Sequence, residues 1–176
     1  MPPDVAESTL TNDIADIVDR YQSRLLAYAC RRLSDLHVAQ DAVQETFLRL
    51  CRHLLETNSP MSDERLAAWL FTVCRSRIID MQRKMGPEDS EAIAVIAVDH
   101  SPPPDKQLSG QEDRDQLASC IAQLTARQQE VLQLRLQAGL SYQQIADVTG
   151  LSKSNVGFHL HAAMTALRQQ LAPEKA

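Results

Sequence analysis

The chain has 176 residues, a length that suits one large domain or two small ones. Hydrophobic residues make up 44% and charged residues 23%, a balance that excludes a wholly disordered chain. Glycine occurs only five times, and the aromatic residues are one Trp, three Tyr and three Phe. Because strands favour aromatic and β-branched residues, a mainly helical fold is expected. The formal net charge of −5 argues at first against a nucleic-acid partner, whose phosphates attract basic side chains.

Several classes of site have no motif in this sequence. No run approaches the ~18 apolar residues of a membrane helix, and the first residues are acidic, so we expect a cytoplasmic protein that is not membrane-inserted. Cys30, Cys51, Cys74 and Cys120 are far apart and have no histidine at metal spacing, which predicts buried free thiols and no metal site. No glycine-rich phosphate loop or nucleophile motif occurs. We therefore predict no catalytic residue, no cofactor and no small-molecule substrate.

Residues 10–84 have the apolar periodicity of three amphipathic helices that form a bundle. The second helix is expected to start at Ser34-Asp35, whose oxygens can cap it, and to end near Asn58-Ser59-Pro60. The third is expected from about Asp63 to Lys84. The apolar stripe of the second helix includes Val43, Phe47, Leu48 and Cys51.

Residues 85–112 are acidic and proline-rich, with three consecutive prolines at 102–104, which predicts a linker. Within it, Ala92 to Val98 form seven apolar residues in a row. This run could be buried against a neighbouring domain or could dock to a partner, and the sequence favours neither.

Residues 113–172 return to a helical pattern with clear start and stop signals. Thr125 to Gln128 and Ser141 to Gln144 both fit the capping box, in which a hydroxyl and a Gln side chain satisfy free backbone N–H groups. Gly139 and Gly150 stand where left-handed residues would end helices, and Ser152 can cap the last helix.

The span from Tyr142 to His161 has the spacing of a helix-turn-helix, with small Ala146, the turn residue Gly150 and apolar Val156. A generic pair of helices could share part of this pattern, but DNA binding is the prediction we favour. The first turns of the second helix would face the major groove. The outward residues there are Ser152, Lys153, Ser154, Asn155, Phe158 and His159.

These residues also carry a resemblance to a known family. The segment from Leu124 to Ser152, followed by Asn155-Val156, resembles region 4 of bacterial sigma factors of the sigma-70 family. The segment Asp41 to Leu50 is similar to the region 2 helix that binds the polymerase clamp, and Ala68 to Lys84 resembles the promoter-melting segment. Having only regions 2 and 4, the chain is similar to the extracytoplasmic-function (ECF) group.

The resemblance implies an all-α fold of two small helical domains joined by the acidic, Pro-rich linker. Region 2 would occupy residues 10–84, the linker 85–112 and region 4 residues 113–172. It further implies a non-enzymatic transcription initiation factor that binds core RNA polymerase, through the β′ clamp and the β flap, together with promoter DNA. Members of the group are often held inactive by an anti-sigma factor, so such a partner is expected here too.

The resemblance also implies roles for individual residues. Asn58 would bind a flipped promoter base, and residues 65–84 carry five basic side chains against Asp80, a net of +4 that could hold phosphates. Trp69 could stack on a base, although we expect it in the core. The expected polymerase-binding residues are Asp41, Gln44, Glu45, Phe47 and Arg49. The expected downstream-element and melting residues are Asn58, Arg65, Arg75, Ser76, Arg77, Arg83 and Lys84.

The chain departs from the usual family pattern in both domains. Ser76 stands where Asn is frequent, and Gly157 to His159 stand where Lys-Ser-Arg is typical, which removes two expected cations. Glycine inside a helix costs about 1 kcal/mol relative to alanine, so Gly157 is expected to allow close approach of the backbone to DNA or to another helix. Two rival functions stay open, namely a stand-alone helix-turn-helix regulator and a sigma-like adaptor that binds only protein.

The net charge is unevenly distributed along the chain. Residues 1–84 hold 11 basic and 12 acidic side chains, residues 85–115 hold 2 and 8, and residues 116–176 hold 5 and 3. The acidic excess therefore lies in residues 85–115, mostly in the predicted linker, and the total of −5 does not exclude nucleic acid as a partner.

Overall fold

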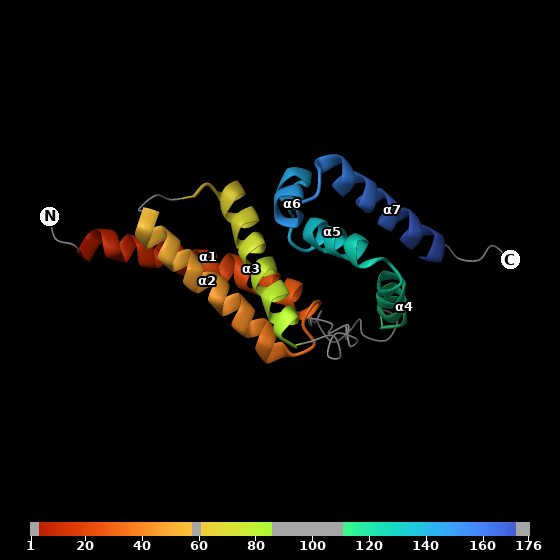
Figure 1. Ribbon diagram of the computed structural model, residues 1–176, viewed down its shortest axis with the longest axis horizontal. Helices are drawn as coiled ribbons and strands as arrows, with labels where there is room; N and C mark the ends of the chain where they lie inside the picture. Colours follow the sequence, from red (N-terminus) through yellow and green to blue (C-terminus); the bar gives the residue numbers. More distant parts are fainter. Residues whose placement is uncertain (1–3, 58–60, 86–110, 172–176) are drawn as a thin grey trace. The chain divides into compact units, whose positions relative to one another are not determined.

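The computed structural model describes residues 4–57, 61–85 and 111–171, with side chains from residue 14 onward apart from those of 85 and 111–113. Within these residues the chain forms seven helices and no strand, so the predicted all-α fold is confirmed (Figure 1). The chain divides into two compact units, residues 1–94 and 95–176. Asn58, the apolar run Ala92–Val98 and most of the predicted linker lie outside the described residues.

The first unit is a three-helix bundle of α1 (Asp4–Cys30), α2 (Leu36–Thr57) and α3 (Asp63–Met85), in which all three helices contact one another (Figure 1). Helix α1 begins well before the expected start near residue 10, because no proline or glycine interrupts helical hydrogen bonding between Asp4 and Cys30. Asp35 Oδ1 accepts the His37 N–H at 2.7 Å and so caps α2 as predicted.

Large apolar side chains from all three helices fill the core of this bundle. Leu25, Leu50 and Leu70 are fully buried, and the Tyr28 and Phe71 rings meet edge to face at 5.5 Å. At the periphery, Gln82 Nε2 donates a 2.8 Å hydrogen bond to the carbonyl of Arg32. These contacts fix α3 against the other two helices, and the fully buried leucines account for much of the stabilisation, each contributing roughly 1.5–3 kcal/mol.

The second unit contains α4 (Gln111–Ala122), α5 (Ala126–Leu136), α6 (Tyr142–Thr149) and α7 (Lys153–Leu171). Helix α7 contacts each of the other three helices, and its buried side chains Val156, Leu160, Ala163 and Leu167 follow the spacing of one helix face. This unit therefore packs around α7, which is also the second helix of the predicted helix-turn-helix.

The helix boundaries of the second unit follow the predicted punctuation. Both capping boxes are present, Thr125 with Gln128 and Ser141 with Gln144. Gly139 and Gly150 adopt left-handed φ values of 67° and 73°. Ser152 Oγ accepts the Asn155 N–H at 3.2 Å and caps α7. The turns that orient the helix-turn-helix are thus specified by local side chains.

Candidate polymerase and promoter interfaces

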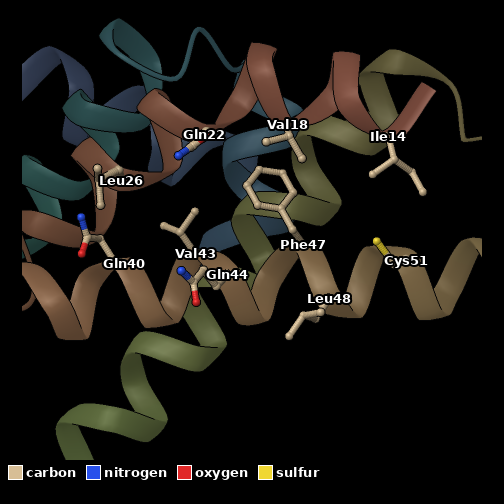
Figure 2. A pocket seen from close by; sticks show the side chains of 10 residues that line it. All are labelled: Ile14, Val18, Gln22, Leu26, Gln40, Val43, Gln44, Phe47, Leu48 and Cys51. Atoms are coloured by element: carbon tan, nitrogen blue, oxygen red, sulfur yellow. The ribbon is translucent and has the colours of Figure 1, made fainter. Parts of the chain in front are cut away.

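One face of α2 is left exposed by the bundle and mixes apolar with charged side chains. Its buried face carries Ala39, Ala42, Val43, Thr46, Leu50 and Leu54. On the opposite face, Leu48 is 52% and Leu55 74% exposed, beside exposed Asp41, Gln44 and Arg52. We call these five residues the outer face of α2. Leu48 belongs to the predicted apolar stripe but points away from α1 (Figure 2).

Between α1 and α2 lies an open groove of about 550 Å³ (Figure 2). Its apolar wall on α1 is formed by Ile14, Val18 and Leu26, and Phe47 of α2 extends its ring into the groove below Val18. Gln44 and Cys51 also line it. The groove is continuous with the outer face of α2, because Gln44 and Leu48 belong to both.

The five expected polymerase-binding residues therefore fall on two flanks of α2. Gln44 and Phe47 line the groove, and Asp41 is exposed on the outer face. On the far flank, Arg49 Nε and Glu45 Oε1 pair at 3.1 Å one helical turn apart. Sequence reasoning missed the α1 wall of the groove and the outward position of Leu55, because periodicity does not reveal which apolar residues remain uncovered.

The expected melting residues of α3 are distributed around the helix. Arg65, Ser76 and Arg83 are exposed and share one face, since they are 11 and 7 residues apart at 3.6 residues per turn. Arg77 lies on another flank and is half-buried, and within the described residues its Nε has no hydrogen-bond partner. Lys84 is exposed at the end of the helix. Arg75 is half-buried and engaged in contacts.

Trp69 is half-buried rather than fully in the core. The imidazole of His53 on α2 stacks on its ring, with centroids 5.4 Å apart and an interplanar angle of 28°. One side of the indole is therefore covered by the protein itself.

The helix-turn-helix is formed by α6, the turn at Gly150 and α7. Thr149 is buried, donates to the Ile145 carbonyl at 2.7 Å and accepts the Leu151 N–H at 3.4 Å. Val156 is fully buried, which anchors the first turns of α7 against the unit. The Thr149 hydroxyl thus stabilises the turn through its two hydrogen bonds to the backbone. The sequence pattern alone did not reveal these bonds.

The residues expected to face DNA lie at the start of α7. Lys153, Ser154, Asn155 and Phe158 are exposed, whereas His159 is half-buried with its ring 5.6 Å from that of Phe158. The expected contact residue Ser152 is also exposed, although its hydroxyl oxygen is engaged as the helix cap. The exposed side chains at this end of α7 are therefore polar, apart from the ring of Phe158.

Gly157 is half-buried in α7 and faces the start of α6. A Cβ built on Gly157 would lie 3.7 Å from Cε2 of Tyr142, an ordinary van der Waals contact. Packing against α6 therefore does not require glycine at this position.

All four cysteines are free. Cys30, Cys74 and Cys120 are buried as predicted, but Cys51 is half-buried at the groove. Burial raises the pKa of the Cys74 thiol to about 12, outweighing the opposing effects of the Thr46 hydrogen bond and the Arg32 charge. Among the residues described, no cluster of His, Cys, Asp or Glu could hold a metal ion, and no helix is long and apolar enough to span a membrane.

Two family models match the two units. The model described as Sigma-70 region 2 matches residues 17–86, and that described as Sigma-70, region 4 matches residues 114–167. The ECF RNA polymerase sigma factor SigL of Mycobacterium tuberculosis is 34% identical over 159 residues, covering 88% of this chain and 86% of SigL. The chain belongs to the ECF sigma factors. Members of this family are non-enzymatic initiation factors, and this ECF sigma factor directs promoter-specific transcription.

Other relatives agree with this assignment. The ECF sigma factor SigW of Bacillus subtilis is 27% identical, covering 89% of this sigma factor and 88% of SigW. Among solved structures, RpoE of Bartonella quintana, in complex with the anti-sigma factor NepR, has a TM-score of 0.65 and 25% identity. That likeness covers 93% of this chain and 99% of RpoE. CnrH, in complex with the cytosolic domain of CnrY, shares the fold at 21% identity and a TM-score of 0.59, covering 94% and 92% of the two chains.

Proposed function

We propose that this ECF sigma factor binds the β′ clamp of core RNA polymerase through the outer face of α2 and the adjoining groove. The observation that carries the proposal is the exposure of Leu48 and Leu55 between charged residues on one helix face. Protein interfaces combine an apolar centre with a polar rim, and this face has both. Phe47 would supply an aromatic contact at the edge of the groove, and Asp41, Gln44, Glu45 and Arg49 the polar rim.

The proposal assigns promoter DNA to two further surfaces. The exposed face of α3 with Arg65, Ser76 and Arg83 would hold the melted strand through its phosphates, with Arg75, Arg77 and Lys84 on the flanks and Asn58 taking a flipped base. The start of α7, from Ser152 to His159, would bind the upstream element in the major groove. The basic net charge of residues 65–84 supports the first assignment.

Further partners are proposed from the family. We assign the β flap to the second unit, and an anti-sigma factor as the regulator, because the similar sigma factor RpoE was solved with one. We also propose that the chain performs no catalysis itself and acts in the cytoplasm, where its polymerase is. Residues 10–84 would form the region 2 domain and residues 113–172 the region 4 domain, joined by a linker at residues 85–112.

The α2 surface can be tested with a matched pair of variants in the full chain. Leu48→Glu should weaken binding to core RNA polymerase at least tenfold, because it places a charge at the apolar centre of the interface. Leu36→Glu is the control, because it introduces the same charge at another exposed leucine of α2, 44% exposed. Leu36 lies 12 residues before Leu48 and points about 120° away from it around the helix axis. Fluorescence anisotropy of the labelled sigma factor measures both. Equal affinity of the two variants for the core enzyme would contradict the proposed interface.

Core binding, measured together with transcription and with binding to duplex DNA, separates the rival functions. A protein-only adaptor would bind core polymerase through α2 but would start no transcript. A stand-alone helix-turn-helix regulator would bind duplex DNA without binding the core enzyme. A sigma factor must both bind the core enzyme and start transcription at a promoter.

A further inference from the structure

Phe158 is an exposed aromatic side chain near the start of α7, on the surface proposed to bind the promoter. It is 68% exposed, whereas its neighbours Val156 and Leu160 on the inner side are buried. Asn155 precedes it by three residues and Ser154 by four, so the three side chains share one helix face. A phenyl ring cannot hydrogen-bond to a base edge. Any selectivity that Phe158 adds must therefore come from apolar contact.

The major groove offers one apolar group for such a contact, the C5-methyl of thymine. We propose that Phe158 selects a thymine in the upstream promoter element by packing against its methyl group. This inference rests on the proposed function of α7 and adds the base that this position favours. An apolar contact of this kind would explain why an aromatic side chain, and not a hydrogen-bonding one, stands at this position.

The geometry of α7 gives the thymine a defined place. Asn155 and Phe158 are three residues apart on one face of α7, about 4.5 Å along the helix axis, so both side chains can reach bases that lie close together. Asn can bind adenine through two hydrogen bonds, which makes an adenine next to the selected thymine pair the expected combination. The His159 ring, 5.6 Å from the Phe158 ring at an interplanar angle of 72°, limits the orientations of the phenyl group.

Among the exposed side chains of this surface, Phe158 is the one that can discriminate by apolar contact, whereas Lys153 and Asn155 discriminate by hydrogen bonds. With histidine neutral, Lys153 is the only charged residue of this surface, which comprises Ser152 to Asn155, Phe158 and His159. Lys153 is the first residue of α7. No arginine is present there to bind guanine through two hydrogen bonds. The thymine selected by Phe158 should accordingly be one A·T pair of the upstream element, next to bases that Lys153 and Asn155 read by hydrogen bonds.

The test uses holoenzyme assembled from core RNA polymerase and the full-length chain. Upstream elements are first selected by transcription from templates randomised in that region. Each thymine of a selected element, on either strand, is then replaced by deoxyuridine, which removes only the C5-methyl. At one position the replacement should reduce open-complex formation about fourfold, the factor expected for withdrawing one buried methyl group.

Three variants connect the effect to Phe158. Phe158→Ala should transcribe the thymine and uracil templates equally, and Phe158→Leu should keep part of the preference because it retains an apolar side chain. Met164→Ala is the matched control, since Met164 is another exposed apolar residue of α7, at 37%, beyond the first turns. It should keep the full preference.

The outcomes distinguish the inference from the function on which it rests. A library that yields no transcript contradicts the sigma factor function and the inference together. Transcripts from elements without thymine, equal yields on thymine and uracil templates, or a preference that survives in Phe158→Ala overturn the inference alone.

Discussion

At the scale of single residues, two glycines of the second unit should respond to alanine in opposite directions. Gly150 has φ +73°, where an alanine Cβ costs about 1–2 kcal/mol. Gly157 is helical with room for a Cβ, so alanine should stabilise the unit by about 0.5–1 kcal/mol. Urea unfolding of the full-length variants, followed by circular dichroism, measures both changes. A less stable Gly157→Ala would contradict the packing described for Tyr142.

The thiols provide a second residue-scale prediction. Cys51 lines the open groove, whereas the other three cysteines are buried, so one thiol of the native protein should react quickly with a maleimide and three slowly. Core RNA polymerase should protect Cys51 if the groove is part of the interface. Peptide mass mapping of the labelled chain, with and without the core enzyme, identifies the site. Rapid labelling of Cys74 instead would contradict the burial seen in the first unit.

Cys74 also gives stability a specific dependence on pH. Its folded pKa, about 12, lies above that of an unfolded thiol, so the stabilisation from its neutral buried form is complete below the unfolded pKa. As the pH rises past that value, the unfolded thiol ionises and the stabilisation is progressively lost. The stability difference between the wild type and Cys74→Ala should therefore narrow from about pH 8.5 upward. A difference that stays constant to pH 11 would refute this.

At the scale of elements, helix α6 should depend strongly on its cap. Ser141→Ala removes the hydroxyl that accepts the Gln144 N–H at 3.2 Å and should destabilise the second unit by about 1 kcal/mol. Ser119→Ala is the control, because Ser119 is exposed in the interior of α4, where alanine is at least as good a helix former. Thermal melts of the two variants should differ by several degrees. Equal melting temperatures would show that the cap contributes little.

The helices also show which features the sequence could predict. Caps at Asp35, Thr125, Ser141 and Ser152 follow from residues a few positions apart, so local reasoning located them. Burial depends on what covers each face, and the same reasoning grouped Leu48 with the inner residues although it is 52% exposed. An apolar residue that faces a partner and one that faces the core look alike in a linear pattern.

The burial of certain polar residues could not be predicted from the sequence either, for a related reason. Thr46 is fully buried because its hydroxyl donates to the Ala42 carbonyl within the same helix at 2.8 Å. Glu130 is also buried, with Arg127 3.7 Å away. Such positions are tolerated only once the hydrogen-bond partners and neighbours are in place, which depends on tertiary packing.

At the scale of the whole molecule, the two units each have their own core and should unfold separately. Leu50 is fully buried in the first unit, and Leu50→Ala should destabilise that unit by about 2–5 kcal/mol. Hydrogen exchange of the full chain should show lost protection in residues 14–84 and unchanged protection in residues 114–171. Equal loss in both units would indicate that they fold as one cooperative body.

The most direct measurement of the central claim is run-off transcription with core RNA polymerase on a pool of genomic promoters, with and without the chain. The account predicts new transcripts that start at a defined set of promoters only when the chain is present. Leu48→Glu should lose these transcripts, and Leu36→Glu should keep them. A chain that binds core polymerase but starts no transcript from any promoter would contradict the claim.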